Sequence, residues 1–257
     1  MSRDPHQLDE QTTAGLEAAL GDAGRPLAVL VPVGSVEPHG PHLPLGTDTL
    51  ISQAAARGAV ALLAARGVAA LVAPPVAYGV TDYARGFPGA VSVPAEVLTA
   101  YLKAVVAGLL AEPRLAHVCL VSNHLEPAHD AAVRAALDGL PPARVSVATP
   151  LIRRWARTLS DEFKRGECHA GRYETSIVLA AAPNLVDRAR AAALPEVAVS
   201  LSESIRQGVD TFAAMGLSEA YAGAPALATA DEGRALIERL AEMVAGEVLE
   251  RLRPEAS

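Results

Sequence analysis

The feature that most constrains the fold is an alternation of short, continuously apolar segments with longer segments of helical character. Four apolar segments are predicted to be buried strands: LAVLVPV (27–33), VAALVAP (68–74), HVCLVSN (117–123) and ARVSVAT (143–149). Helices are predicted between them over TLISQAAARGAVALLAARG (49–67), PAEVLTAYLKAVVAGLLAE (94–112) and PAHDAAVRAALDGL (127–140). Apolar strands separated by helices are typical of a parallel sheet with helices on both faces, so an α/β fold is expected.

The chain beyond Thr149 is predicted to be mostly helical, ending in an amphipathic helix over residues 231–252. No internal repeat, low-complexity region or linker divides the sequence, and 257 residues suit one core, so residues 1–257 are expected to form a single domain. The stretch from Leu194 to Pro225 has no clear pattern. It is interpreted either as an excursion over the functional site or as an oligomer contact.

Charge and cysteine content narrow the class of protein. The net charge of −7 argues against nucleic acid or an acidic membrane surface as the main partner. No apolar run is long enough to cross a bilayer, and the N-terminal residues lack the apolar core of a signal peptide. The two cysteines do not make a disulfide framework, so the reducing cytoplasm is the expected compartment.

Five of the seven histidines fall in three short windows that also carry carboxylates. The first window, GSVEPHGPHLPLGTD, is a Pro- and Gly-stiffened loop directly after the first predicted strand, and SNHLEPAHD follows the third. Ligands of open parallel sheets bind at the carboxyl ends of the strands, so these two loops are expected to converge. The candidate residues are Glu37, His39, His42 and Asp48 in the first window, His124, Glu126, His129 and Asp130 in the second, and His169 and Glu174 in ECHAGRYETS.

Imidazole and carboxylate groups without paired cysteines suit Zn, Mn, Fe(II) or Co rather than a structural thiolate site. Several carboxylates in neighbouring loops are also compatible with two ions about 3.5–4 Å apart, as in many hydrolases.

Some of these residues have simpler interpretations. Asp48 could be only the N-cap of the following helix. His42 and His129 are interpreted as hydrogen-bonding neighbours of the site or as solvated residues. Cys168 stands beside His169, which invites a thiol-nucleophile interpretation, but adjacent residues in a chain seldom face each other. The recurrence of the same chemistry in three windows favours a metal site.

The same windows resemble the motifs of the creatininase (creatinine amidohydrolase) family. VPVGSVEPHGPHLPLGTDTL resembles the family signature GS-x-EQHG-x-HLP-x-x-TD, and HAGRYETSIVLAAAPNLV resembles HAG-x-x-ETS. VSNHLEPAHD, FPGAVSV and GAPALATADEG match further segments, so the resemblance runs from about Leu27 to Gly233.

This resemblance implies a three-layer α/β/α sandwich, two divalent metal ions (Zn, Mn or Fe) and a homo-oligomer, usually a hexamer. Carried over by position, Glu37 and His124 hold one ion, His39 and Glu126 hold the other, and Asp48 bridges them. His169 is the candidate proton shuttle, and Glu174 is a catalytic carboxylate that lies beside the metals or binds one.

The implied function is metal-dependent hydrolysis of a C–N amide bond in a small molecule. Alternatives are a non-catalytic metal-binding scaffold, or a family branch that hydrolyses a peptide or a cyclic ketone. The sequence departs from the family pattern at Pro38, Asn123 and Ala224, and lacks the His that often precedes FPG. It has a single tryptophan, Trp155, whereas creatininase surrounds its flat substrate with tryptophans, which argues against creatinine.

Overall fold

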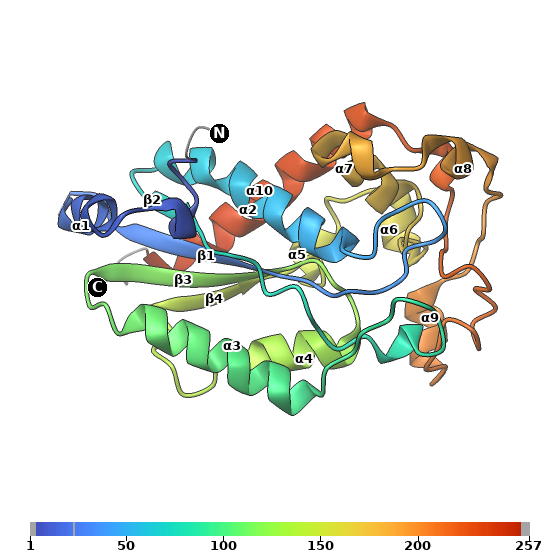
Figure 1. Cartoon of the computed structure of the whole chain (residues 1–257), viewed down its shortest axis with the longest axis horizontal. Helices are drawn as coiled ribbons and strands as arrows, with labels where there is room; N and C mark the ends of the chain where they lie inside the picture. Colours follow the sequence, from blue (N-terminus) through green and yellow to red (C-terminus); the bar gives the residue numbers. More distant parts are fainter. Residues whose placement is uncertain (1–3, 23, 253–257) are drawn as a thin grey trace.

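The computed structural model describes residues 4–22 and 24–252. Its centre is a four-stranded parallel sheet in the order β2-β1-β3-β4 (Figure 1). The strands are β1 (Leu27–Val33), β2 (Ala69–Val72), β3 (Leu115–Ser122) and β4 (Val145–Ala148). The longer helices are α1 (Thr13–Gly21), α2 (Thr47–Ala64), α3 (Ala95–Leu110), α4 (Pro127–Ala135), α7 (Arg172–Ala181) and α10 (Ala230–Leu252). The shorter helices are α5 (Arg153–Ala156), α6 (Asp161–Arg165), α8 (Arg188–Ala193) and α9 (Leu201–Arg206).

Helices cover both faces of the sheet, as the apolar strands predicted. Alternate residues of β1 enter different cores: Ala28 and Leu30 pack with α2, α7 and α10, whereas Val29 and Val31 pack with α3 and α4. Figure 1 shows the sheet between these two layers. The predicted α/β/α sandwich is therefore confirmed, and its strand ends agree with the prediction to within two residues. No helix in the described ranges has the length and apolarity needed to cross a membrane.

Helices α7 and α10 pack against each other very closely at Gly233. A Cβ atom at this position would lie only 1.8 Å from the carbonyl oxygen of Ser176. Glycine is required there because the backbone of α7 occupies the space of any side chain. This contact fixes the position of α7, whose first turn carries Glu174.

We expect Gly233→Ala to lower the free energy of unfolding by at least about 1–3 kcal/mol, because the added methyl group forces two packed helices apart. Gly108 in α3 is a matched control, since a Cβ there meets nothing within 4 Å. Gly108→Ala should raise the stability by roughly 0.5–1 kcal/mol, because alanine loses less backbone entropy in a helix. Denaturant unfolding of both variants measures the difference. Equal stability of the two variants would contradict the close contact.

Candidate metal centre

Four of the five predicted ligands meet at the carboxyl ends of β1 and β3, and Glu174 joins them there. Glu37 and His39 lie in the loop after β1, and Asp48 lies in the first turn of α2. His124 follows β3, and Glu174 lies in the first turn of α7. All five side chains are buried, so three carboxylates and two imidazoles share a space from which water is largely excluded.

Asp48 is shared by two groups of ligand atoms. In the first group, His124 Nδ1 lies 3.0 Å from Asp48 Oδ2 and 3.3 Å from Glu37 Oε1. In the second group, His39 Nε2 lies 3.3 Å from Asp48 Oδ1 and 3.5 Å from Glu174 Oε2. The two oxygens of one carboxylate thus face different imidazoles, which is the arrangement expected of a carboxylate that bridges two cations.

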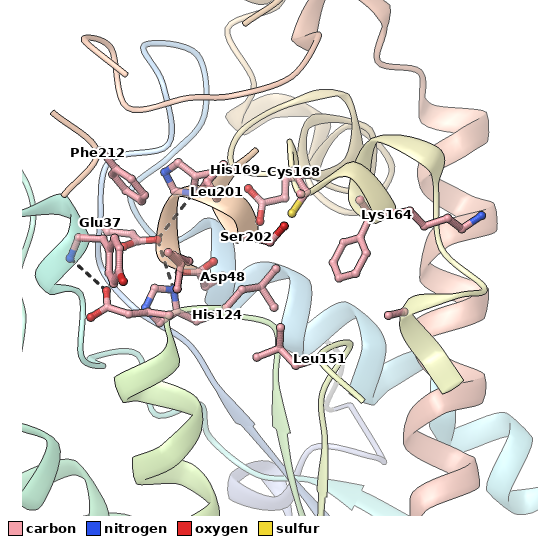
Figure 2. A pocket seen from close by; sticks show the side chains of 18 of the residues that line it. Glu37, Asp48, His124, Leu151, Lys164, Cys168, His169, Leu201, Ser202 and Phe212 are labelled. Atoms are coloured by element: carbon pink, nitrogen blue, oxygen red, sulfur yellow. Dashed lines mark hydrogen bonds and ion pairs between the residues drawn. The ribbon is translucent and has the colours of Figure 1, made fainter. Parts of the chain in front are cut away.

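The helix-cap interpretation of Asp48 does not hold. Helix α2 begins at Thr47 and its N-cap is Gly46, so Asp48 lies inside the first turn. Its side chain makes no capping hydrogen bond and points into the cluster, where Figure 2 shows it beside Glu37 and His124.

Backbone carbonyl groups orient the two histidines. His39 Nδ1 lies 3.1 Å from the carbonyl oxygen of Glu37, and His124 Nε2 lies 2.7 Å from that of Val80. A carbonyl oxygen only accepts, so each of these nitrogens carries the proton. In the neutral ring the other nitrogen, which faces the carboxylates, has a free lone pair that can bind a metal ion. Metal-bound histidines are held in this way in most proteins.

The carboxylates are held as firmly as the imidazoles. The Thr81 hydroxyl donates to Glu37 Oε2, and the backbone N–H of Ala170 donates to Glu174 Oε2 at 2.6 Å. Ala170 has a φ of 50°, in the left-handed region that costs a non-glycine residue about 1–3 kcal/mol. The strained backbone therefore aims an N–H group at the Glu174 carboxylate.

A positive charge within the cluster would stabilise its buried carboxylates. Burial lowers the pKa of His39, but Asp48, Glu174 and Glu37 together raise it to about 10. Burial raises the pKa of Glu174 to about 8, although His39 opposes this shift. Both shifts report that buried carboxylates so close together need a cation between them. An imidazolium proton can fill this role, and so can a metal ion.

The chemistry of the donors fits a metal ion. His39 Nε2 and Asp48 Oδ2 are both buried, and neither has a hydrogen-bond partner within the described chain. Unpaired buried polar atoms are costly, and here both face other ligand atoms. Mixed imidazole and carboxylate donors are those of Zn, Mn and Fe(II) sites.

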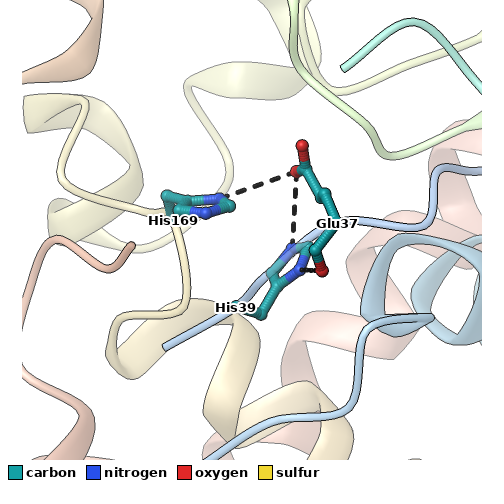
Figure 3. Close-up of side chains that lie close together, drawn as sticks. All are labelled: Glu37, His39 and His169. Atoms are coloured by element: carbon teal, nitrogen blue, oxygen red, sulfur yellow. Dashed lines mark hydrogen bonds and ion pairs between the residues drawn. The ribbon is translucent and has the colours of Figure 1, made fainter. Parts of the chain in front are cut away.

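His169 lies beside this centre. Its Nδ1 atom is 3.9 Å from Glu37 Oε1, and its ring centroid is 4.5 Å from that of His39 (Figure 3). Its Nε2 atom lies 3.1 Å from the carbonyl oxygen of Pro38 and therefore carries the proton. Phe212 covers the ring, with centroids 4.3 Å apart. His169 also forms a third possible ligand group with Glu37 and His39.

Glu126 lies apart from the three ligand groups found among the described residues. Its carboxylate accepts hydrogen bonds from the backbone N–H groups of Asp82 and Tyr83, at 3.0 and 3.2 Å. Burial raises its pKa to about 7. Its assignment as a metal ligand stays a prediction.

Three further residues of the windows, His42, His129 and Cys168, are buried close to the metal centre. His42 is buried and lies 2.8 Å from the Thr175 hydroxyl, and His129 packs edge-on against His124. Neither is solvated. Cys168 is buried, and burial raises the pKa of its thiol well above the usual value. A neutral thiol is a poor nucleophile, which argues against the cysteine mechanism.

A pocket of about 420 Å³ opens onto the centre (Figure 2). Glu37, Asp48, His124 and His169 lie at one end, together with Glu126 and Glu174. Leu201, Ser202, Ile205 and Phe212 line it from the segment that had no clear pattern, so part of this excursion does cover the site. Trp155 is absent from the lining and instead donates a hydrogen bond to Glu247.

The family model of creatinine amidohydrolase, Creatininase, matches residues 9–248. The chain belongs to the creatininase family. Family membership makes it a hydrolase. Solved creatininase structures share the fold at about 20% identity: "Creatininase Mn" has a TM-score of 0.73 and covers 97% of this chain and 99% of its own. A putative creatinine amidohydrolase from Bacteroides fragilis has a TM-score of 0.75 at 21% identity, covering both chains fully.

Two enzymes with named activities are more similar to this chain in sequence than the solved structures are. The mycofactocin precursor peptide peptidase of Mycolicibacterium smegmatis is 34% identical over 224 residues, covering 85% of this chain and 81% of that protein. The 3-dehydro-scyllo-inosose hydrolase of Thermotoga maritima is 30% identical over 154 residues, covering 58% of this chain and 45% of that protein.

Three contributors to the site were missed in the sequence: Thr81, Tyr83 and Phe212. The first two lie in the loop after β2, so the rule that ligands bind at strand ends could have pointed to this loop. No metal-binding residue type marks it, however. Phe212 comes from the excursion between α9 and α10, and nothing local signals that it stacks on His169.

Proposed function

We propose that this protein hydrolyses a C–N amide bond with the help of two divalent metal ions. Glu37, Asp48 and His124 would hold one ion, and His39, Asp48 and Glu174 the other. Glu174 takes the place that the resemblance assigned to Glu126, because its carboxylate lies 3.5 Å from His39 Nε2. The single observation that carries this proposal is the division of the two Asp48 oxygens between two imidazoles.

Divalent ions in such a site supply Lewis acidity, which polarises a carbonyl group and makes water a nucleophile near neutral pH. The protein supplies the proton transfers. An amide nitrogen leaves poorly unless it is protonated, so an acid–base group is needed beside the scissile bond. His169 is suited to this role, since its Nδ1 lone pair faces the centre while its other nitrogen is fixed on Pro38. Nδ1 would take the proton that the attacking water loses and pass it to the leaving amine.

The peptidase relative makes an amide within a peptide the first substrate class to test. The pocket has the size of small-molecule sites, so a small amide remains the main proposal. The inosose hydrolase relative keeps a cyclic ketone as an alternative. A non-catalytic scaffold is disfavoured, because a scaffold has no need of an imidazole held free beside the cluster.

We expect the purified protein to carry up to two Zn, Mn or Fe ions per chain, because six buried donor atoms surround two positions. Elemental analysis of protein prepared without chelator measures this content. Removal of the ions should abolish hydrolysis in a panel of cyclic amides, linear amides and short peptides, and metal should restore it. Protein that holds no transition metal would contradict the proposed function. Metal-loaded protein that cleaves no member of the panel would favour the scaffold.

The finer features of the family are also proposed for this chain: a single domain, a homo-oligomer and a place in the cytoplasm. Four exposed apolar side chains support self-association, and they lie on α3 and the loop before it: Tyr78, Val91, Val97 and Tyr101. Both cysteines are free thiols, which agrees with a reducing compartment.

A further inference from the structure

The pocket has a second end whose chemistry differs from that of the metal centre. It lies toward α5 and α6, where Leu151, Ala156 and Phe163 add an apolar lining. Figure 2 shows Leu151 and Lys164 well away from Glu37, so the pocket extends from the carboxylates toward this end. A substrate that reaches from the metal centre to α5 must therefore carry an apolar part.

Two arginines line the same end. Arg153 and Arg157 lie one helical turn apart, and the backbone N–H of Arg157 donates to the carbonyl of Arg153 at 3.3 Å. Residues spaced in this way lie on one face of a helix. Two like charges side by side repel each other by a few tenths of a kcal/mol, so the pair is unfavourable unless an anion joins it.

No carboxylate of the described chain lies within 4.0 Å of either guanidinium, although the protein is acidic overall. The neighbouring cations, in contrast, have carboxylate partners. Arg154 is paired with Glu247 and Glu250, and Lys164 is paired with Asp161. Among the described residues that line the pocket, Arg153 and Arg157 are thus the cations without a carboxylate partner, and both are exposed to solvent, so a ligand can reach them.

We propose that Arg153 and Arg157 bind a carboxylate group of the substrate. This inference rests on the proposed function and deepens it: the substrate is an amide whose apolar body fills the pocket and whose carboxylate meets the two guanidiniums. Arginine suits this role because its planar fork matches the two oxygens of a carboxylate. The substrate class is then an acidic amide, such as a short peptide with a free carboxyl end or an N-acyl amino acid.

Binding of a matched pair of probes tests this inference without knowledge of the natural substrate. Suberic acid monohydroxamate carries a metal-binding group at one end and a carboxylate at the other, and its carboxamide analogue lacks the charge. Glutaric and sebacic analogues vary the length. At the best length, calorimetry with the metal-loaded protein should find the carboxylate bound about tenfold tighter or more, as expected for a charge-assisted hydrogen bond.

Variants locate the effect. The double variant Arg153→Gln/Arg157→Gln should bind the carboxylate probe no more tightly than the carboxamide probe, while its affinity for the carboxamide is unchanged. The control Arg57→Gln/Arg188→Gln removes the same charge from exposed positions outside the pocket, and it should keep the preference. Equal affinities of both probes for the native protein at every length, or a preference that survives in the double variant, would overturn the inference. Binding of neither probe would contradict the metal centre itself, and this inference with it.

Discussion

Asp48→Asn is expected to release both metal ions and to lower turnover by at least about a hundredfold. Loss of a residue that merely supports a metal ligand typically costs 10–100-fold, and loss of a bridging ligand should cost more. The amide keeps the size of the carboxylate but loses its charge, which offsets the repulsion between two cations. Because both Asp48 oxygens face imidazoles, both sites should weaken together. Metal stoichiometry and turnover of the purified variant measure the effect.

Asp130→Asn is the matched control. Asp130 belongs to the second histidine window, but it is half-buried on α4, pairs with Arg134 and is not part of the pocket lining, so the same loss of charge should leave metal content and turnover unchanged. If Asp48→Asn retained two ions per chain, the bridging role would be wrong. If it lost one ion and kept the other, Asp48 would be a ligand of a single ion.

His169→Ala is expected to keep the fold and the metals but to lose roughly two to four decades of turnover, the usual contribution of general acid–base catalysis. The imidazole is held by Pro38 on one side and covered by Phe212 on the other, so its free nitrogen is fixed beside Glu37. Removal of the ring takes away the proton donor for the leaving amine. Steady-state kinetics on any amide that the protein cleaves measures the loss.

A series of leaving groups separates this role from a structural one. The loss should shrink for amides whose amines leave readily, because these need less help from a proton donor, whereas general damage to the site would affect all substrates equally. His6→Ala serves as the control, because His6 is exposed and lies outside the three histidine windows. A His169→Ala protein with reduced metal content would make His169 a ligand, as its distance to Glu37 and His39 permits. Unchanged turnover would remove it from the mechanism.

The layers of the fold were predictable because they depend on local patterns. A strand buried on both faces must be apolar at every position, and β1 is apolar along its whole length, so its role could be inferred without knowing its neighbours. The order of the strands could not be inferred. β1 pairs with β3 as well as β2, and this pairing brings together loops that are more than eighty residues apart.

The site was predictable only in its residue types. The three windows contained the imidazoles and carboxylates that the structure brings together, and the family motifs indicated which of them to expect as ligands. The second carboxylate that faces His39 Nε2, beside Asp48, could not be predicted. The resemblance assigned Glu126 to it, and that assignment stays a prediction. In the structure Asp48 and Glu174 are the carboxylates within 3.5 Å of His39 Nε2, and the α7–α10 contact at Gly233 and the strained Ala170 hold the first turn of α7 at the centre.

The α/β class, the family and the chemical nature of the centre could all be inferred before folding was considered, since each depends on residue types and their spacing along the chain. Three arrangements became visible in the folded chain alone: Asp48 faces two imidazoles, Phe212 covers His169, and Arg153 and Arg157 line the pocket without a carboxylate partner among the described residues. The physical reason is that these arrangements depend on distances between segments remote in sequence. Those distances are set by the packing of helices on the sheet, and no local pattern records them.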